Sequence, residues 1–232
     1  MTKIADPVQL FNCPGPKPNG LQASEEGLWV IDQGNNYVYL LDWTNGETIK
    51  SFETETVKSS GITLDDEGNI WVASTYNCKI YKIDSKSGET IEIFESPGQG
   101  MNATREHDSE NYQNTGDHGL EWKEGLLYVA SPPSQYIHVM DPKSWKEISR
   151  TKVPGYRVHG IAWSEEEGNI WVADTAMGIV ARIRLSDSRI YDSFRVPHPV
   201  QVHGMTIKNN TLWYCDDRKP IGILDVSMEP DF

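Results

Sequence analysis

The sequence is poor in cysteine, has no long apolar run and carries too few basic residues to balance its acidic ones. Its three cysteines, Cys13, Cys78 and Cys215, form neither an even set nor a CxxC spacing. That pattern favours reduced thiols in an intracellular protein over a disulfide framework. No stretch of eighteen apolar residues occurs, so no segment is predicted to span a membrane. The first residues also lack an apolar signal segment, and we therefore expect a cytoplasmic protein.

The excess of acidic residues argues against two classes of partner. The formal net charge is −13 at pH 7, and a field of this sign repels nucleic-acid phosphates and anionic membrane surfaces. We therefore expect no nucleic acid and no membrane as partner, and a soluble monomer. The P-loop, GxGxxG, HExxH and GxSxG motifs are absent as well. No nucleotide or organic cofactor is expected, and neither zinc-protease nor α/β-hydrolase chemistry is predicted.

What the chain does contain is an internal repeat of about forty residues. Five segments begin with a polar residue, a glycine and an aliphatic residue, and each continues into a strand with a central aromatic residue. The polar residues are Asn19, Ser60, His118, His159 and His203, and the aromatic strands are expected at 28–32, 70–74, 127–131, 170–174 and 212–216. A third strand follows in every repeat and a fourth in four of them, with turn residues between, which predicts a four-stranded antiparallel meander.

The chain length and the incomplete last repeat predict a closed ring. The last repeat has only three strands before Phe232, and the segment 7–11 resembles the missing outer strand. Pairing of that segment with the last repeat would remove an exposed sheet edge. We therefore predict one all-β domain over residues 1–232, a five-bladed β-propeller of four-stranded antiparallel blades closed by the N-terminal strand. A β-sandwich is the alternative, which five matches to one template disfavour.

One repeat is longer than the others. Ser60 and His118 are 58 residues apart, whereas the polar residues of other neighbouring repeats are 41 to 44 apart. The surplus is a polar insertion at about 98–117, which is either a lid or specificity element or an irregular excursion. It contains Arg105, a predicted substrate-binding residue.

Polar residues are predicted to gather at one mouth of the channel. The first strand of each blade lines the channel and the second runs back beside it, so first-strand starts and second-strand ends share a face. His118, His159 and His203 come from three consecutive blades and are the predicted acid–base residues. Asp174 and Asp216, at second-strand ends, are predicted to orient them or to bind a divalent cation. The glycine after each histidine is expected to let the backbone turn tightly into the channel.

Three further residues complete the predicted mouth, and structural roles remain open for several of these groups. Asn19, Tyr156 and Arg157 are predicted to bind substrate, with Arg157 as the fixed cation for an anionic group. Each His-Gly can instead be a hydrogen-bonded turn, and each second-strand aspartate can instead accept from backbone amides of a turn. The aromatic residues of the second strands are expected to pack between blades; they are Trp29, Trp71, Tyr128, Trp171 and Trp213.

Two stretches carry a family resemblance. The segments SSGITLDDEGNIWVAS (59–74) and VHGIAWSEEEGNIWVAD (158–174) resemble blades of the streptogramin B lyase group within the NHL and SMP-30-like propellers. The resemblance implies elimination of a carbon–oxygen ester bond by histidines at the His-Gly position, matched by His159 and His203. It also implies Mg²⁺ held partly by an acid at the second-strand end, where this chain has Asp instead of the family's Glu. The SMP-30-like lactonases imply Ca²⁺, with Asn19 as the matching ligand. Those rings have seven and six blades, more than are predicted here.

The leading hypothesis is a small-molecule lyase or hydrolase with histidine acid–base residues at the mouth. A divalent metal, Mg²⁺ or Ca²⁺, would stabilise negative charge that develops on oxygen. Two alternatives stay open, a non-catalytic propeller that binds a small ligand or a protein at the same mouth, and an SMP-30-like lactonase.

Overall fold

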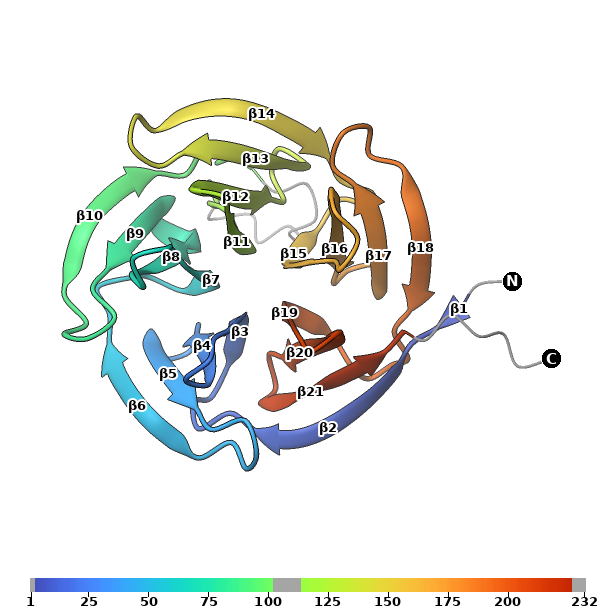
Figure 1. Cartoon of the computed structure of the whole chain (residues 1–232), viewed down its shortest axis with the longest axis horizontal. Coiled ribbons are helices and arrows are strands. Elements are labelled where there is room, and N and C mark those ends of the chain that lie inside the picture. The colour runs from blue at the N-terminus through green and yellow to red at the C-terminus, as the bar shows by residue number, and fades with distance from the viewer. Residues whose placement is uncertain (1–2, 102–113, 227–232) are drawn as a thin grey trace.

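The computed structural model describes residues 3–101 and 114–226, which form five antiparallel sheets arranged as blades around a central axis (Figure 1). Blade 1 comprises β3 (Pro18–Ala23), β4 (Leu28–Asp32), β5 (Tyr37–Leu41) and β6 (Thr48–Glu53), and blade 2 comprises β7 (Ser59–Leu64), β8 (Ile70–Ser74), β9 (Lys79–Ile83) and β10 (Thr90–Glu95). Blade 3 comprises β11 (Leu120–Lys123), β12 (Leu126–Ser131), β13 (Tyr136–Asp141) and β14 (Lys146–Lys152). Blade 4 comprises β15 (Val158–Trp163), β16 (Asn169–Asp174), β17 (Ile179–Arg184) and β18 (Ile190–Arg195).

Blade 5 is completed by the N-terminal segment, as predicted. It contains β19 (Val202–Lys208), β20 (Thr211–Asp216), β21 (Pro220–Asp225) and, as its outer strand, β2 (Asp6–Asn12). Strand β2 pairs antiparallel with β21, so the two ends of the chain close the ring (Figure 1). The five-bladed, N-terminally closed propeller is therefore confirmed.

A second contact of the N-terminal segment with the ring, to blade 4, was not predicted. The two-residue strand β1 (Lys3–Ile4) pairs in parallel with the outer strand β18 of blade 4. The Lys3 ammonium also lies 3.0 Å from a carboxylate oxygen of Asp192, which is nearly fully buried. A strand of two residues is too short to show any periodicity in a sequence, so this contact could be found only in the folded ring.

The core lies between adjacent blades, where the aromatic residues of the second strands pack. Trp71 of β8 is almost completely buried and stacks on Trp122 of the next blade, with ring centroids 5.9 Å apart. Trp29 shares a cluster with Ile62 and Val72 of blade 2. These contacts fit the predicted packing role of the aromatic strands. All three cysteines are buried and none forms a disulfide.

The glycine of each repeat serves close packing and not the tight turn expected from the sequence. Gly20, Gly61, Gly119, Gly160 and Gly204 line the narrow part of the channel, and none has a positive φ. A methyl group on Gly61 would overlap the carbonyl oxygen of His118, and one on Gly20 would lie 2.7 Å from the carbonyl oxygen of Ser60. The first strands therefore approach each other so closely that only glycine fits.

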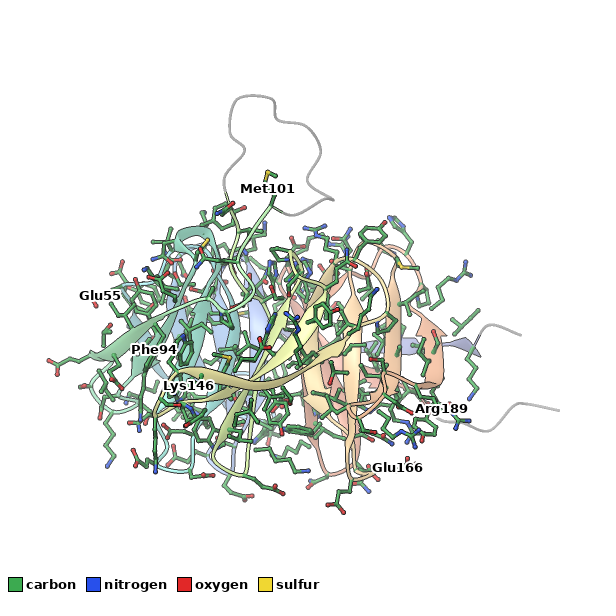
Figure 2. All side chains as sticks on the ribbon, turned by 90° about the horizontal axis from the view of Figure 1, so that it is seen from above. Glu55, Phe94, Met101, Lys146, Glu166 and Arg189 are labelled. Carbon is green, nitrogen blue, oxygen red and sulfur yellow. The ribbon has the colours of Figure 1, made fainter. Side chains whose placement is uncertain are left out.

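The insertion emerges at the mouth that carries the second-strand ends. Met101, at its described start, stands on one face of the ring, whereas Glu166, in the turn between β15 and β16, lies on the opposite face (Figure 2). Gly100 and Thr115, near the two ends of the insertion, form an isolated antiparallel bridge. The described part of the chain contains no helix long and apolar enough to cross a membrane.

Candidate active site at the channel mouth

Three imidazole rings from consecutive blades meet at the axis. His118 lies two residues before β11, His159 lies in β15, and His203 lies in β19. The ring centroids of His118 and His159 are 4.2 Å apart, and those of His159 and His203 are 4.9 Å apart, both in edge-to-face contact. Their exposed fractions are only 7%, 4% and 5%. The structure thus brings together the three residues that the repeat singled out.

Hydrogen bonds to backbone carbonyls fix the tautomer of two of the rings. The Nδ1 atom of His159 lies 3.2 Å from the carbonyl oxygen of Arg157, and that of His203 lies 3.1 Å from the carbonyl oxygen of Gln201. A carbonyl oxygen can only accept, so in each ring Nδ1 carries the hydrogen. The Thr175 hydroxyl, 3.0 Å from Nδ1 of His159, is a second acceptor for it. Each neutral ring therefore leaves Nε2 with its lone pair available as a base.

The surroundings keep these rings neutral. Burial lowers the pKa of His159 well below its usual value, and the neighbouring His118 and His203 lower it further. Burial also lowers the pKa of His203, while the nearby carboxylate of Asp217 raises it in part. The Oδ2 atom of Asp217 lies 3.9 Å from Nε2 of His203. A desolvated neutral imidazole next to a carboxylate is an arrangement typical of proton-transfer sites.

The rings line a polar cavity of about 120 Å³ at the mouth. Asn19 and Arg157, both predicted to bind substrate, also line it, together with Lys17 and Asp217. The Oδ1 atom of Asn19 is buried and has no hydrogen-bond partner among the described residues. Because an unpaired buried acceptor is costly, this oxygen favours a ligand that brings a donor.

The cavity carries charges of both signs. Lys17 lies 3.5 Å from Asp217, so these two partly neutralise each other. Within the described residues, no salt bridge involves Arg157, although its charge contributes to lowering the pKa of His159. Arg157 is therefore the cation best placed to receive an anionic group of a ligand.

Asp174 and Asp216, predicted as metal ligands, bind the backbone of the surrounding turns. The carboxylate of Asp174 accepts from the amides of Tyr156, Arg157 and Met177 at 2.8 to 2.9 Å. The carboxylate of Asp216 accepts from the amide of Gln201 at 2.8 Å and from the guanidinium of Arg218. These geometries match the structural role that the sequence left open for second-strand aspartates.

Mg²⁺ and Ca²⁺ prefer several oxygen ligands, usually with more than one carboxylate among them. Among the described residues that line the cavity, Asp217 is the one carboxylate, and neutral oxygen donors come from side chains such as Asn19 and Gln33. Within residues 3–101 and 114–226, no group of three or more His, Cys, Asp or Glu side chains is placed to hold a metal ion.

The remaining predicted residues lie elsewhere. Tyr156 is exposed, with 42% of its surface accessible, and does not line the cavity. Arg105 lies outside the described residues. Sequence reasoning missed Lys17 and Asp217. Lys17 stands two residues before Asn19, as Arg157 stands two residues before His159, so the repeat itself contained the signal for Lys17.

Comparison with known proteins identifies the fold. No family model matches the chain, and no curated protein matches its sequence. A glutaminyl cyclase from Myxococcus xanthus superposes with a TM-score of 0.74 at 9% identity, covering 98% of this chain and 99% of that one. A streptogramin B lyase superposes with a TM-score of 0.57 at 18% identity, covering 95% of this chain and 97% of that one. A catalytically inactive virginiamycin B lyase from Staphylococcus aureus with quinupristin superposes with a TM-score of 0.54 at 19% identity, covering 91% of this chain and 67% of that one. At these identities the likeness shows the shared β-propeller fold.

Proposed function

We propose that this propeller is a small-molecule lyase or hydrolase in which a neutral imidazole at the channel mouth acts as general base. The observation that carries the proposal is the buried His159 ring, whose Nδ1 is bound to the backbone and whose Nε2 remains a free base. Its lowered pKa keeps that base unprotonated near neutral pH. The solved enzymes with this fold add support for catalysis over simple binding.

The geometry supports the same first step for both reaction types. Nε2 of His159 takes a proton, either from a carbon next to a carbonyl group or from a water molecule. In an elimination, the electron pair of the broken C–H bond forms the double bond and the C–O bond breaks, releasing a carboxylate. In hydrolysis, the activated water attacks the carbonyl carbon and the alkoxide leaves with a proton. His203, beside Asp217, is the second group able to exchange that proton.

Substrate recognition is assigned to the groups that flank the rings. Arg157 binds an anionic group, and Oδ1 of Asn19 accepts a hydrogen bond from a substrate donor. The cavity of about 120 Å³ admits only part of a larger substrate. We therefore propose an ester or lactone whose reacting group enters the mouth and whose remainder lies outside it.

A second candidate is the cyclisation of an N-terminal glutaminyl residue. It is favoured by the glutaminyl cyclase, which matches nearly the whole of this chain with a TM-score of 0.74. The same imidazole would take a proton from the substrate amine, which attacks the side-chain amide carbon, and would return the proton to the amide nitrogen as the C–N bond breaks and ammonia leaves. Release of ammonia from a peptide with N-terminal glutamine distinguishes this candidate from the first.

The test is a substrate screen followed by matched variants. Purified protein is incubated with cyclic esters, lactones and glutaminyl peptides, and products are identified by mass spectrometry in H₂¹⁸O. Incorporation of ¹⁸O identifies a hydrolase, and an unsaturated product without ¹⁸O identifies a lyase. His159→Asn should lower kcat by about a hundredfold or more, whereas replacing the exposed His198 by Gln should not. A His159→Asn variant with unchanged kcat would contradict the assignment, and binding without turnover would support the non-catalytic alternative.

A further inference from the structure

A second set of hydrogen-bonded side chains lies in blade 3, outside the channel mouth. Ser134 is in the turn between β12 and β13, His138 is on β13, and Glu147 is on β14. The Ser134 hydroxyl lies 2.8 Å from Nε2 of His138, and Nδ1 of His138 lies 2.5 Å from Oε2 of Glu147. The three side chains therefore form a continuous Ser–His–Glu chain.

The positions of the hydrogens in this Ser–His–Glu series follow from the groups at its two ends, a carboxylate and a hydroxyl. A carboxylate can only accept, so Nδ1 of His138 carries a hydrogen and donates it to Glu147. In the neutral ring Nε2 is then bare and accepts the hydrogen of the Ser134 hydroxyl. The alternative acceptor for that hydroxyl, the carbonyl oxygen of Ser131, is more distant at 3.5 Å. This is the arrangement in which an imidazole can remove the proton of a serine.

The imidazole of His138 is enclosed by the surrounding protein. His138 has only 3% of its side chain exposed, whereas Glu147 has 37% and Ser134 is partly exposed. The backbone of Gly98 covers the ring, since a methyl group there would lie 2.9 Å from Nε2 of His138. The base is therefore desolvated, and the serine that it contacts is partly exposed.

Two other blades carry a different hydrogen-bonded pair at the equivalent positions. In blade 1 the amide of Asn35 donates to the hydroxyl of Tyr39 at 2.8 Å, and in blade 2 Asn77 donates to Tyr81 at 3.0 Å. Both pairs have the same spacing of four residues and the same location, from the turn to the third strand. An Asn–Tyr pair thus provides the structural hydrogen bond, and among these three blades only blade 3 replaces it by groups that can transfer a proton.

We propose that Ser134 is an activated nucleophile that reacts with acyl esters and phosphonates, a reactive site separate from the channel. His138 takes the hydroxyl proton at Nε2 while Oγ of Ser134 bonds to the carbonyl carbon or phosphorus. The leaving group departs with its electron pair, and His138 returns the proton to it when it is an alkoxide. Glu147 stabilises the imidazolium that forms in between. With a fluorophosphonate, the P–O bond forms and the P–F bond breaks.

The experiment uses the full chain and a fluorophosphonate probe, with adducts mapped by mass spectrometry of peptides. The expected result is one adduct, on Ser134. Ser144 is the internal control, because its hydroxyl donates directly to Asp141 at 2.6 Å and has no imidazole partner. It should stay unlabelled under the same conditions.

His138→Tyr is the matched variant, since it installs the residue that blades 1 and 2 carry at this place and retains Ser134. It should fold with a melting temperature close to that of the unmodified protein and label about a hundredfold more slowly or less. Glu147→Gln, at a more exposed position, should also slow labelling. The proposal is overturned if Ser134 labels no faster than Ser144, or if either variant labels at the original rate.

Discussion

The ring of His118 meets that of His159 edge to face, with 4.2 Å between ring centroids. Two imidazolium ions at this separation would repel each other strongly in a buried site. The contact therefore selects a state in which at most one of the rings is charged, and it contributes to the lowered pKa of His159. Near neutral pH the cluster therefore contains uncharged imidazoles, which the proposed proton transfer requires.

The lowered pKa of His159 predicts a loss of stability on the acid side. In the unfolded chain the ring titrates near its usual value of about 6.5, whereas in the folded protein it takes up a proton only well below that value. Its contribution to stability is therefore fully present above about pH 6.5 and is lost as the pH falls towards the folded pKa. Between about pH 7.5 and about pH 5, the free energy of unfolding should fall more for the unmodified protein than for His159→Gln. Equal decreases in urea titrations would contradict this.

Asp117 predicts the opposite dependence. Burial raises the pKa of this carboxyl, at the end of the insertion, to about 7. The stability that it contributes is present below its usual pKa of 3.8 and is lost as the pH rises through about 7. We compare the free energy of unfolding of Asp117→Asn with that of the unmodified protein. This difference should be more favourable to the variant at about pH 8 than at about pH 4, by up to about 4 kcal/mol. A constant difference between the two proteins across this range would show that the carboxyl is not buried.

Removal of a second-strand aspartate tests its structural role. Asp174→Ala leaves the amides of Tyr156, Arg157 and Met177 without their acceptor, and we expect a loss of about 2 to 4 kcal/mol in the free energy of unfolding. Asp217→Ala, which removes only partly exposed ion pairs, should cost less than about 1 kcal/mol. Both are measured by chemical denaturation with and without Mg²⁺ or Ca²⁺. A stabilisation by either ion that disappears in Asp174→Ala would instead support the metal prediction.

The five glycines that line the narrow part of the channel predict that a larger residue there destabilises the fold. Gly61→Ala would place a methyl group onto the carbonyl oxygen of His118, and we expect a loss of about 2 kcal/mol or more because the first strands must move apart. Gly100→Ala is the control, since the nearest atom to its methyl group is in ordinary contact at 3.5 Å. Thermal melts of the two variants should differ clearly. If they coincide, the blades are not packed as closely at the axis as described.

The fold could be predicted because each blade repeats the same spacing of glycine and aromatic strand. The convergence of His118, His159 and His203 followed from that repeat, since equivalent positions must face the same axis. The role of Asp174 could not be decided, because a carboxylate that accepts from turn amides and one that binds a metal have the same sequence pattern. The Ser134–His138 contact was also hidden, since it depends on the side-chain directions of a turn and a strand. The pairing of β1 with β18 joins segments almost two hundred residues apart and leaves no local signal.

The most direct test of the account is the protonation state of His159, measured by two-bond ¹H–¹⁵N correlation spectra of the imidazole rings across a pH titration, with His159→Gln used for assignment. We expect a neutral His159 ring with hydrogen on Nδ1 and a bare Nε2 from about pH 8 down to pH values below its usual pKa of about 6.5. A ring that carries its hydrogen on Nε2, or that becomes charged at or above its usual pKa of about 6.5, would contradict it.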